Sequence, residues 1–291
     1  MSAFRGGAFA VIGDPVAHSV SPPMQRAAFL AAGVESTYVA ERVTAAALPA
    51  VWPELLRRLS GWNVTRPLKE AALTLVDHVA PEAETCGSVN TVVVNGERTA
   101  GHSTDGAGFL AALGHVRPEP ARRAVILGTG GATRAVAAAL AGTGTTVLLV
   151  GRNAAAGRSV AGDLSARGRA VRFAGGPSAL TGALDGADLV VNATPLGDPS
   201  RPGISPIPQD VALGALEPRP VVFDLVYRPR RTPLLEQAAA AGCPTVEGIE
   251  MLIGQGARSF ELWTGLPAPV EIMRAAAYRS LDEEVVEWGG R

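Results

Sequence analysis

The fold is decided by residues 124–140, Ala124-Val-Ile-Leu-Gly128-Thr-Gly130-Gly131-Ala132-Thr133-Arg-Ala-Val-Ala-Ala-Ala-Leu140. The first four residues form the continuous apolar run of a strand that is covered on both faces. Glycines then allow a tight turn and small residues continue as a helix, the order in which βαβ units bind dinucleotides. The missing Cβ atoms let the backbone approach a pyrophosphate, which the helix N-terminus holds. We therefore predict a dinucleotide site at the turn of Gly128, Gly130 and Gly131, the alternative being a glycine-rich turn without a ligand.

The end of the next strand indicates which dinucleotide is bound. NAD-binding domains usually place a carboxylate there, which accepts from the ribose 2′-hydroxyl. In this chain the strand 146–150 is followed by Gly151-Arg152-Asn153, which contains no acid. Because a guanidinium suits a 2′-phosphate, Arg152 predicts NADP, the alternative being a solvated loop charge. Whether Arg158 also reaches that phosphate stays open.

The rest of the 291 residues alternates β-branched runs with helical stretches rich in alanine and leucine. This pattern is typical of an α/β fold with mainly parallel sheets, and the length fits two domains. We place a boundary near Asp105. Residues 1–105, completed by the helical segment 245–291, form one domain, and residues 106–244 form a second, Rossmann-type domain, with a cleft between them. The strands that we expect are 8–12, 37–43, 61–64, 91–94, 124–127, 146–150, 170–173, 189–192 and 221–225.

Charge and composition exclude several classes of function. The formal charge is −1, from 26 basic and 27 acidic residues, so no broad cationic surface is available for nucleic acid or an anionic membrane. Two cysteines and four histidines do not make a disulfide framework or a zinc site, so we expect no metal. The N-terminal residues lack the pattern of a secretory signal. We expect a soluble, cytoplasmic protein that is a monomer or a homodimer.

Lys69 is the single lysine among the 26 basic residues, and the other 25 are arginines. Since lysine, unlike arginine, can lose its proton in a protein, Lys69 is a candidate for proton chemistry, although it can also be a chance remnant of composition. Pro67 suits the first turn of a helix and places Lys69 about one turn inside it, where the helix dipole and Arg66 disfavour an ammonium. A neutral lysine there would act as a general base.

Asp105 and a pair of serines carry further candidate chemistry. Asp105 stands at the predicted end of the first domain and faces the cleft if the boundary is right. Taken alone, it is the N-cap of a helix that starts at Gly106. Ser19 and Ser21 offer two hydroxyls at the start of a helix that Gly33 closes. Such an arrangement can hold a carboxylate, although capping explains Ser21 without a ligand.

Taken together, these segments resemble the shikimate dehydrogenase family. They match in the family's order and over nearly the whole chain. The matching segments are Gly13-Asp14-Pro15-Val-Ala-His18-Ser19-Val-Ser21-Pro22, Asn63-Val-Thr65-Arg-Pro67-Leu-Lys69-Glu70, Gly87-Ser-Val-Asn90-Thr91, Ser103-Thr104-Asp105-Gly106, Gly128-Thr-Gly130-Gly131-Ala132, Asn192-Ala-Thr194-Pro195, Asp224-Leu-Val-Tyr227 and Gly248-Ile-Glu-Met251-Leu-Ile-Gly-Gln255. The resemblance implies an oxidoreductase that interconverts 3-dehydroshikimate and shikimate with NADP(H), a reaction of aromatic amino acid precursor biosynthesis.

The resemblance also implies a role for each matched residue. Lys69 and Asp105 would form the catalytic pair beside the substrate hydroxyl, and Ser19 and Ser21 would hold the ring carboxylate. The substrate-binding residues would be Ser19, Ser21, Asn63, Thr65, Asn90, Tyr227 and Gln255. The cofactor would contact Gly128, Gly130, Gly131, Ala132, Arg152, Thr194, Leu225 and Gly248.

Four positions depart from the family's pattern. Arg66 stands where an apolar residue or histidine is common, His102 and Ser103 replace an acid and an asparagine, and Glu250 stands where glycine is common. These changes leave the reaction type intact but bear on the choice of ring acid. A quinate or aminoshikimate dehydrogenase is therefore an alternative, and an NADP-binding sensor without catalysis is a more distant one.

Overall fold

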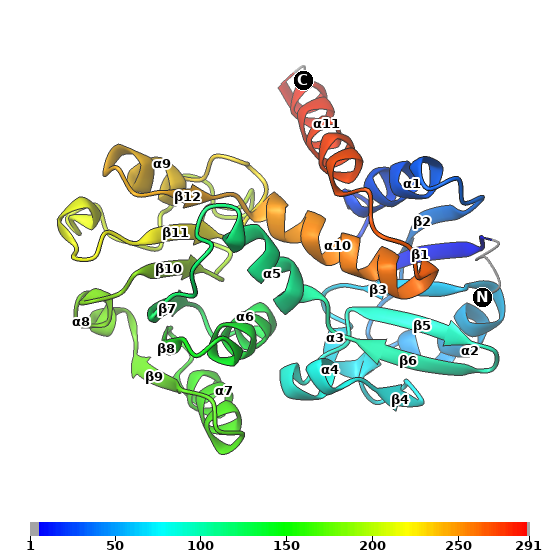
Figure 1. The fold of residues 1–291 in the computed structure, drawn as a ribbon, viewed down its shortest axis with the longest axis horizontal. Helices are drawn as coiled ribbons and strands as arrows, with labels where there is room; N and C mark the ends of the chain where they lie inside the picture. Colours follow the sequence, from blue (N-terminus) through cyan, green and yellow to red (C-terminus); the bar gives the residue numbers. More distant parts are fainter. Residues whose placement is uncertain (1–5, 290–291) are drawn as a thin grey trace. The chain divides into compact units, whose positions relative to one another are not determined.

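The computed structural model describes residues 6–289, with side chains up to residue 282. It divides the chain into two compact units, residues 1–108 with 252–291 and residues 109–251. Figure 1 follows the chain through both units. The start of the chain, on which the expected lack of a secretory signal rests, lies partly outside the described residues. None of the helices in residues 6–289 combines the length and the apolar character needed to span a bilayer.

The first unit is built around a mixed sheet, which has six strands within the described residues in the order β2-β1-β3-β5-β6-β4. The strands are β1 Ala8–Gly13, β2 Thr37–Arg42, β3 Gly61–Val64, β4 His78–Val79, β5 Thr91–Asn95 and β6 Arg98–His102. β1 runs parallel to β2 and β3, whereas β5 is antiparallel to both β3 and β6. Because β4 is parallel to β6, three of these five pairings are parallel, so the sheet is mixed but mainly parallel, as predicted.

Side chains alternate between the two faces along each strand, and in this sheet apolar side chains lie on both faces. Helices cover both of these faces. On one face, Ile12 of β1 packs in a core with Trp52 of α2. On the other, Phe9 stacks against Phe29 of α1 and meets Trp263 of α10. The helices of this unit are α1 Ser21–Ala31, α2 Leu48–Arg58, α3 Lys69–Ala72, α4 Pro81–Cys86 and α11 Val270–Gly289, and α11 lies along α1. Two helices, α5 Asp105–Gly114 and α10 Gly248–Thr264, cross the unit boundaries.

The second unit contains a parallel sheet of the Rossmann type. Its strand order is β12-β11-β10-β7-β8-β9, and every pairing is parallel within the described residues. The strands are β7 Arg123–Leu127, β8 Thr146–Val150, β9 Val171–Gly175, β10 Leu189–Asn192, β11 Val221–Asp224 and β12 Thr245–Val246. The helices are α6 Gly131–Gly142, α7 Ala154–Ala166, α8 Leu180–Leu184 and α9 Pro233–Ala240, with short 3-10 turns at Pro177–Ala179 and Leu213–Ala215. The predicted α/β class is confirmed.

The prediction misses β4, β6 and β12. β6 reads Arg98-Thr-Ala-Gly-His102, and this polar, glycine-containing run gives no strand signal by composition. It forms a hairpin with β5 through the two-residue turn Gly96-Glu97, where Gly96 has a φ of +66°. A glycine at the first position of such a turn is a hairpin signal that would have indicated β6.

The start of α1 differs from the prediction in one position. Val20 occupies the N-cap and Ser21 is the first helical residue, so the predicted N-cap role of Ser21 is wrong. The helical bonding starts one residue earlier, because the Met24 N–H, which a cap at Ser21 could use, donates to the Val20 carbonyl at 3.3 Å. Instead, Ser19 Oγ accepts from the backbone N–H of Ser21 at 3.2 Å. Gly33, with a φ of +65°, follows the helix end as predicted.

Candidate active site and dinucleotide site

Three strand ends of the first unit meet at one end of its sheet. β3 and β6 finish there, and β5, antiparallel to both, starts there. The register places Asn63 of β3 opposite Thr91 of β5, so the two side chains share one face. Asn90 precedes β5, and Thr104 and Asp105 follow β6. The topology therefore gathers polar residues from distant parts of the sequence.

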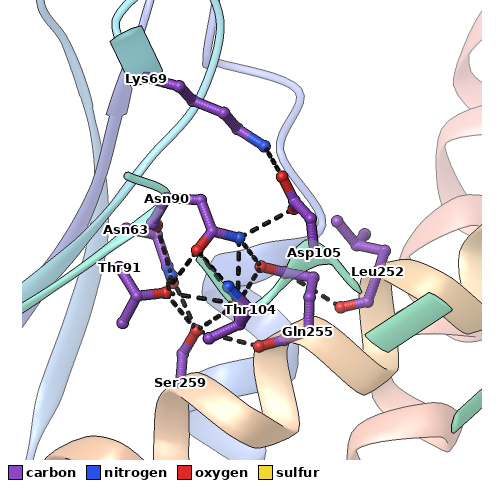
Figure 2. A network of polar contacts seen from close by, with 9 residues as sticks. All are labelled: Asn63, Lys69, Asn90, Thr91, Thr104, Asp105, Leu252, Gln255 and Ser259. Carbon is purple, nitrogen blue, oxygen red and sulfur yellow. Dashed lines mark hydrogen bonds and ion pairs between the residues drawn. The ribbon is translucent and has the colours of Figure 1, made fainter. Parts of the chain in front are cut away.

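Lys69 and Asp105 face each other at this end of the sheet (Figure 2). Lys69 Nζ donates to Asp105 Oδ2 at 2.5 Å, and the side chains are 27% and 9% exposed. Lys69 is the first residue of α3, so the prediction that it lies one turn inside a helix is wrong. The chain first turns at Thr65 to Leu68, where the Leu68 N–H donates to the Thr65 carbonyl at 2.9 Å. Since α3 has only four residues and begins at Lys69, the predicted effect of a helix dipole on an ammonium inside the helix does not apply.

Asn90 anchors the second oxygen of Asp105. Asn90 Oδ1 accepts from the backbone N–H of Thr104 at 2.8 Å, and because that group can only donate, the amide nitrogen must point the other way. Asn90 Nδ2 donates to Asp105 Oδ1 at 2.8 Å and lies 3.3 Å from Gln255 Oε1. Both oxygens of the carboxylate therefore have side-chain donors. Asp105 is itself the first residue of α5, so the N-cap role that its position alone suggests is wrong, and its carboxylate is bound by Lys69 and Asn90 instead.

Asn63 belongs to the same buried cluster. Its Nδ2 lies 3.1 Å from the Asn90 carbonyl oxygen, 3.0 Å from Thr91 Oγ1 and 3.0 Å from Ser259 Oγ. Its Oδ1 accepts from the Tyr38 hydroxyl at 2.6 Å. Because protein groups occupy both ends of this amide, Asn63 supports the site, and its direct contact with substrate stays a prediction.

Tyr38 connects this cluster to the start of α1. Burial raises the pKa of Tyr38 well above its ordinary value, and a hydrogen bond with the Ser21 side chain acts in the opposite direction. The phenol therefore keeps its hydrogen for Asn63. Of the predicted carboxylate-binding serines, Ser21 is buried and Ser19 is half-buried.

The other predicted substrate residues lie on separate elements. Thr65 is half-buried just after β3, and Gln255 is buried on α10, where its Nε2 donates to the Leu252 carbonyl at 3.0 Å. Tyr227 is half-buried after β11 in the second unit. The first unit thus brings Lys69, Asp105, Asn63, Asn90 and Gln255 into one network (Figure 2).

The glycine turn of the second unit has the geometry of an anion cradle. Gly128 has a φ of +123°, and a Cβ there would lie 2.9 Å from the Ala193 carbonyl oxygen, so a side chain is excluded. Apart from the adjacent residues and the backbone of α6 itself, no atom of the described residues lies within 4 Å of a Cβ position at Gly130 or Gly131. Gly130 is the N-cap of α6 and has no side chain to cap its first N–H groups. The open turn and these N–H groups suit a pyrophosphate.

Arg152 is exposed directly after β8. Its neighbour Asn153 caps α7, since Asn153 Oδ1 accepts from the Ala156 N–H at 3.0 Å. The Asn153 side chain is thus used as a cap, and Arg152 is the charged residue between β8 and α7. This placement is compatible with the predicted contact to a 2′-phosphate.

A second buried cluster lies where β10 and β11 end. Asp224 Oδ1 accepts from Asn192 Nδ2 at 2.8 Å and from the Val226 N–H at 3.0 Å, and Oδ2 accepts from the Thr232 hydroxyl at 2.6 Å. Burial raises the pKa of Asp224 to about 6, although these three donors act to lower it. Asn192 Oδ1 in turn accepts from the Thr194 N–H at 2.9 Å. The cluster therefore fixes the two loops that follow these strands.

These loops carry the remaining predicted cofactor residues. Thr194 and Leu225 are half-buried, and Gly248 is buried at the start of α10. A Cβ on Gly248 would lie 2.6 Å from the Leu225 carbonyl oxygen and 2.7 Å from that of Asp224. Glycine is thus required at position 248 for packing, whatever the cofactor contacts.

Several residues of the two clusters were missed by sequence reasoning. Thr91, Thr104 and Asp224 lie inside the quoted segments, yet the sequence gives them no role of their own. Tyr38 and Ser259 lie outside every such segment. One signal was available, because Ser259 stands four positions after Gln255 and so shares its helix face.

The comparisons agree with this organisation. Residues 11–92 match the model of the shikimate dehydrogenase substrate binding domain, and residues 248–278 match that of the shikimate 5'-dehydrogenase C-terminal domain. A shikimate dehydrogenase (NADP(+)) of Halorubrum lacusprofundi is 41% identical over 290 residues, covering 94% of this chain and 99% of the relative.

Two solved structures extend the comparison. The shikimate 5-dehydrogenase of Thermus thermophilus in complex with NADP(H) and shikimate is 39% identical, with a TM-score of 0.84 over 94% of this chain and 99% of that one. The quinate dehydrogenase of Corynebacterium glutamicum in complex with NAD is 32% identical, with a TM-score of 0.82 over 93% of this chain and 98% of that one. On these similarities, the chain belongs to the shikimate dehydrogenase family.

Proposed function

We propose that this protein is an NADP-dependent shikimate dehydrogenase, which interconverts shikimate and 3-dehydroshikimate. The observation that carries the proposal is the Lys69–Asp105 pair, held by Asn90 in a chain that matches its relatives over nearly its whole length. A lysine beside a fixed carboxylate is suited to moving a proton at a substrate hydroxyl.

The second unit fits the cofactor that this reaction needs. Gly128, Gly130, Gly131 and Ala132 would hold the pyrophosphate, since the turn leaves its backbone open and the first N–H groups of α6 uncapped by any side chain of Gly130. Arg152 would meet the 2′-phosphate, and Thr194, Leu225 and Gly248 would line the rest. When bound, NADP⁺ supplies the hydride acceptor.

The protein's own part in the chemistry is proton transfer. In its neutral form, after the ammonium has released a proton, Lys69 takes the proton from the hydroxyl of the alcohol as its carbon loses hydride, and Asp105 again holds the ammonium that forms. Asn90 keeps the Asp105 carboxylate aimed at that ammonium through its bond to Oδ1. In the reverse direction the same lysine returns the proton.

The substrate's remaining groups define the rest of the site. Ser19 and Ser21, with Tyr227, would bind the ring carboxylate, and Thr65, Asn90 and Gln255 would bind ring hydroxyls. Asn63 would act through its neighbours. The expected ligand is a small anionic ring acid, with no nucleic acid or membrane as partner, and the expected states are a cytoplasmic monomer or homodimer.

A quinate dehydrogenase is a second candidate. A quinate dehydrogenase bound to NAD is 32% identical to this chain. His102 and Ser103, which depart from the family's pattern, directly precede Thr104 and Asp105. Substitutions so near the catalytic pair bear on which ring acid is accepted.

The test is the rate of reduced cofactor formation by purified protein with shikimate, quinate and aminoshikimate, each with NADP⁺ and NAD⁺. We expect the highest kcat/KM with shikimate and NADP⁺. A preference for quinate would establish the second candidate. Absence of turnover with all six combinations would contradict both.

A further inference from the structure

One buried hydroxyl of the first unit touches both asparagines of the network. Thr91 is fully buried, and its Oγ1 lies 3.0 Å from Asn63 Nδ2 and 3.0 Å from Asn90 Oδ1. The same oxygen lies 2.8 Å from Ser259 Oγ on α10. We propose that Thr91 is a positioning residue, whose hydroxyl keeps Asn90 turned toward Asp105 and which Ser259 supports. The role in turnover rests on the proposed function.

The direction of these bonds follows from groups that have only one role. The backbone carbonyl of Asn90 can only accept, so the Asn63 nitrogen faces it and the Asn63 oxygen faces Tyr38. The same nitrogen faces three acceptors, the Asn90 carbonyl, Thr91 Oγ1 and Ser259 Oγ, and shares its two hydrogens among them. Thr91 keeps its own hydrogen for Asn90 Oδ1 or for Ser259 Oγ, and both acceptors belong to the network.

These contacts matter because an asparagine amide has two orientations that differ little in shape. As placed, Asn90 Oδ1 meets the Thr104 N–H and the Thr91 hydroxyl, while Nδ2 donates to Asp105. Turned over, the amide oxygen would face the carboxylate and the nitrogen would face a second donor. Each buried polar group left without its partner costs free energy, so Thr91 adds to the preference for the first orientation.

Ser259 links the helix to the strands. Ser259 Oγ lies 2.9 Å from the Gln255 carbonyl oxygen and 2.8 Å from Thr91 Oγ1, and it has one hydrogen to donate. When Ser259 donates to Thr91, the Thr91 hydrogen is left for Asn90 Oδ1. Asn63 and Thr91 are opposite each other in the β3–β5 register, so one serine meets both. Removing the Ser259 hydroxyl should therefore lower kcat, as removing the Thr91 hydroxyl should.

Thr91→Val removes the hydroxyl at nearly constant volume, and Thr91→Ser retains it. The control is Thr99→Val, because Thr99 is also buried in this sheet and its hydroxyl donates to Asp77 Oδ2 at 2.8 Å, outside the network. With shikimate and NADP⁺, we expect kcat of Thr91→Val to fall on the order of 10-fold, with a smaller change in KM. Thr91→Ser should recover most of the rate, Thr99→Val should keep it, and Ser259→Ala should show a smaller loss than Thr91→Val.

Unchanged kcat in folded Thr91→Val, or an equal loss in Thr99→Val, would overturn the proposal. A wild-type protein that turns over none of the ring acids would instead contradict the proposed function. The positioning claim is then decided by the crystal structure of Thr91→Val, which does not depend on activity. A turned Asn90 amide or a lost contact to Asp105 supports it, and an unchanged Asn90 Nδ2 to Asp105 Oδ1 contact overturns it.

Discussion

Each of the two buried polar clusters contains one carboxylate, but the groups that surround the two carboxylates differ in charge and exposure. In the first unit, Asp105 is paired with the ammonium of Lys69, which is 27% exposed. In the second unit, Asp224 is fully buried and its partners within the described residues are three uncharged donors, from Asn192, Val226 and Thr232. One carboxylate has a cation that a substrate can reach, whereas the other is enclosed.

This difference predicts a role in catalysis for Asp105 and a structural role for Asp224. A carboxylate that is paired with an accessible amine can respond when a proton moves on a ligand. A carboxylate that is enclosed by donors fixes loops instead, and the raised pKa of Asp224, about 6, reflects burial without a compensating charge. We therefore expect substitutions in the first cluster to change turnover and those in the second to change stability.

The largest expected effect is the loss of the proton acceptor. Lys69→Ala should lower kcat by about 10² to 10⁴, since a positioned acid or base contributes about that much. Lys69→Arg should be similarly impaired, because arginine retains the charge but does not release the proton. The measurement is steady-state turnover with shikimate and NADP⁺. Arg58→Ala, which removes a surface cation paired with Glu41, is the control, and near-normal turnover in either Lys69 variant would refute the role.

Substitutions in the second cluster should lower the stability of the protein. Asp224→Ala leaves the donors of Asn192 and Thr232 without their acceptor, so we expect the free energy of unfolding at pH 5 to fall by roughly 3 kcal/mol. Urea unfolding followed by circular dichroism measures this change. Asp163→Ala, which breaks an ion pair of the same unit where the carboxylate is 52% exposed, should cost less than about 1 kcal/mol. Equal losses in the two variants would remove the contrast between buried and exposed acids.

Local signals explain what the sequence predicted well. Ala124 to Leu127 and the glycines after them lie within a few residues of each other, so a strand, a turn and a helix can be inferred from that stretch alone. Most of the expected strands form for the same reason. The candidate pair was indicated by the isolation of Lys69 among arginines and by the family resemblance.

Non-local packing explains what was missed. Asn63 and Ser259 are 196 positions apart, and their contact depends on how α10 meets β3. The register of β3 on β5, which places Asn63 opposite Thr91, joins residues that are 28 positions apart. The start of α3 at Lys69 depends on the turn before it. None of these follows from periodicity within one segment.

The pH dependence of stability tests the enclosed carboxylate separately. Because burial raises the pKa of Asp224 in the folded state to about 6, above an unfolded value of about 3.9, the folded chain binds this proton more tightly. Its contribution is fully present below about pH 3.9 and is lost as pH rises through about 6, a change of about 3 kcal/mol. Urea titrations between pH 4 and 7 should show this fall in the wild type relative to Asp224→Asn, which does not titrate. Parallel pH profiles would contradict the raised pKa.

The smallest effect is expected at Ser103, which adjoins the first cluster without joining it. Ser103 is buried, and its Oγ has no hydrogen-bond partner in the part of the chain that the structure describes, although Thr104 and Asp105 beside it are both bonded. Since Ser103→Ala removes an unsatisfied hydroxyl, we expect stability to change by less than about 0.5 kcal/mol or to rise slightly. Turnover with shikimate should stay close to normal. A large loss of kcat in folded Ser103→Ala would extend the catalytic cluster by one residue and make the hydroxyl at this position part of the choice of ring acid.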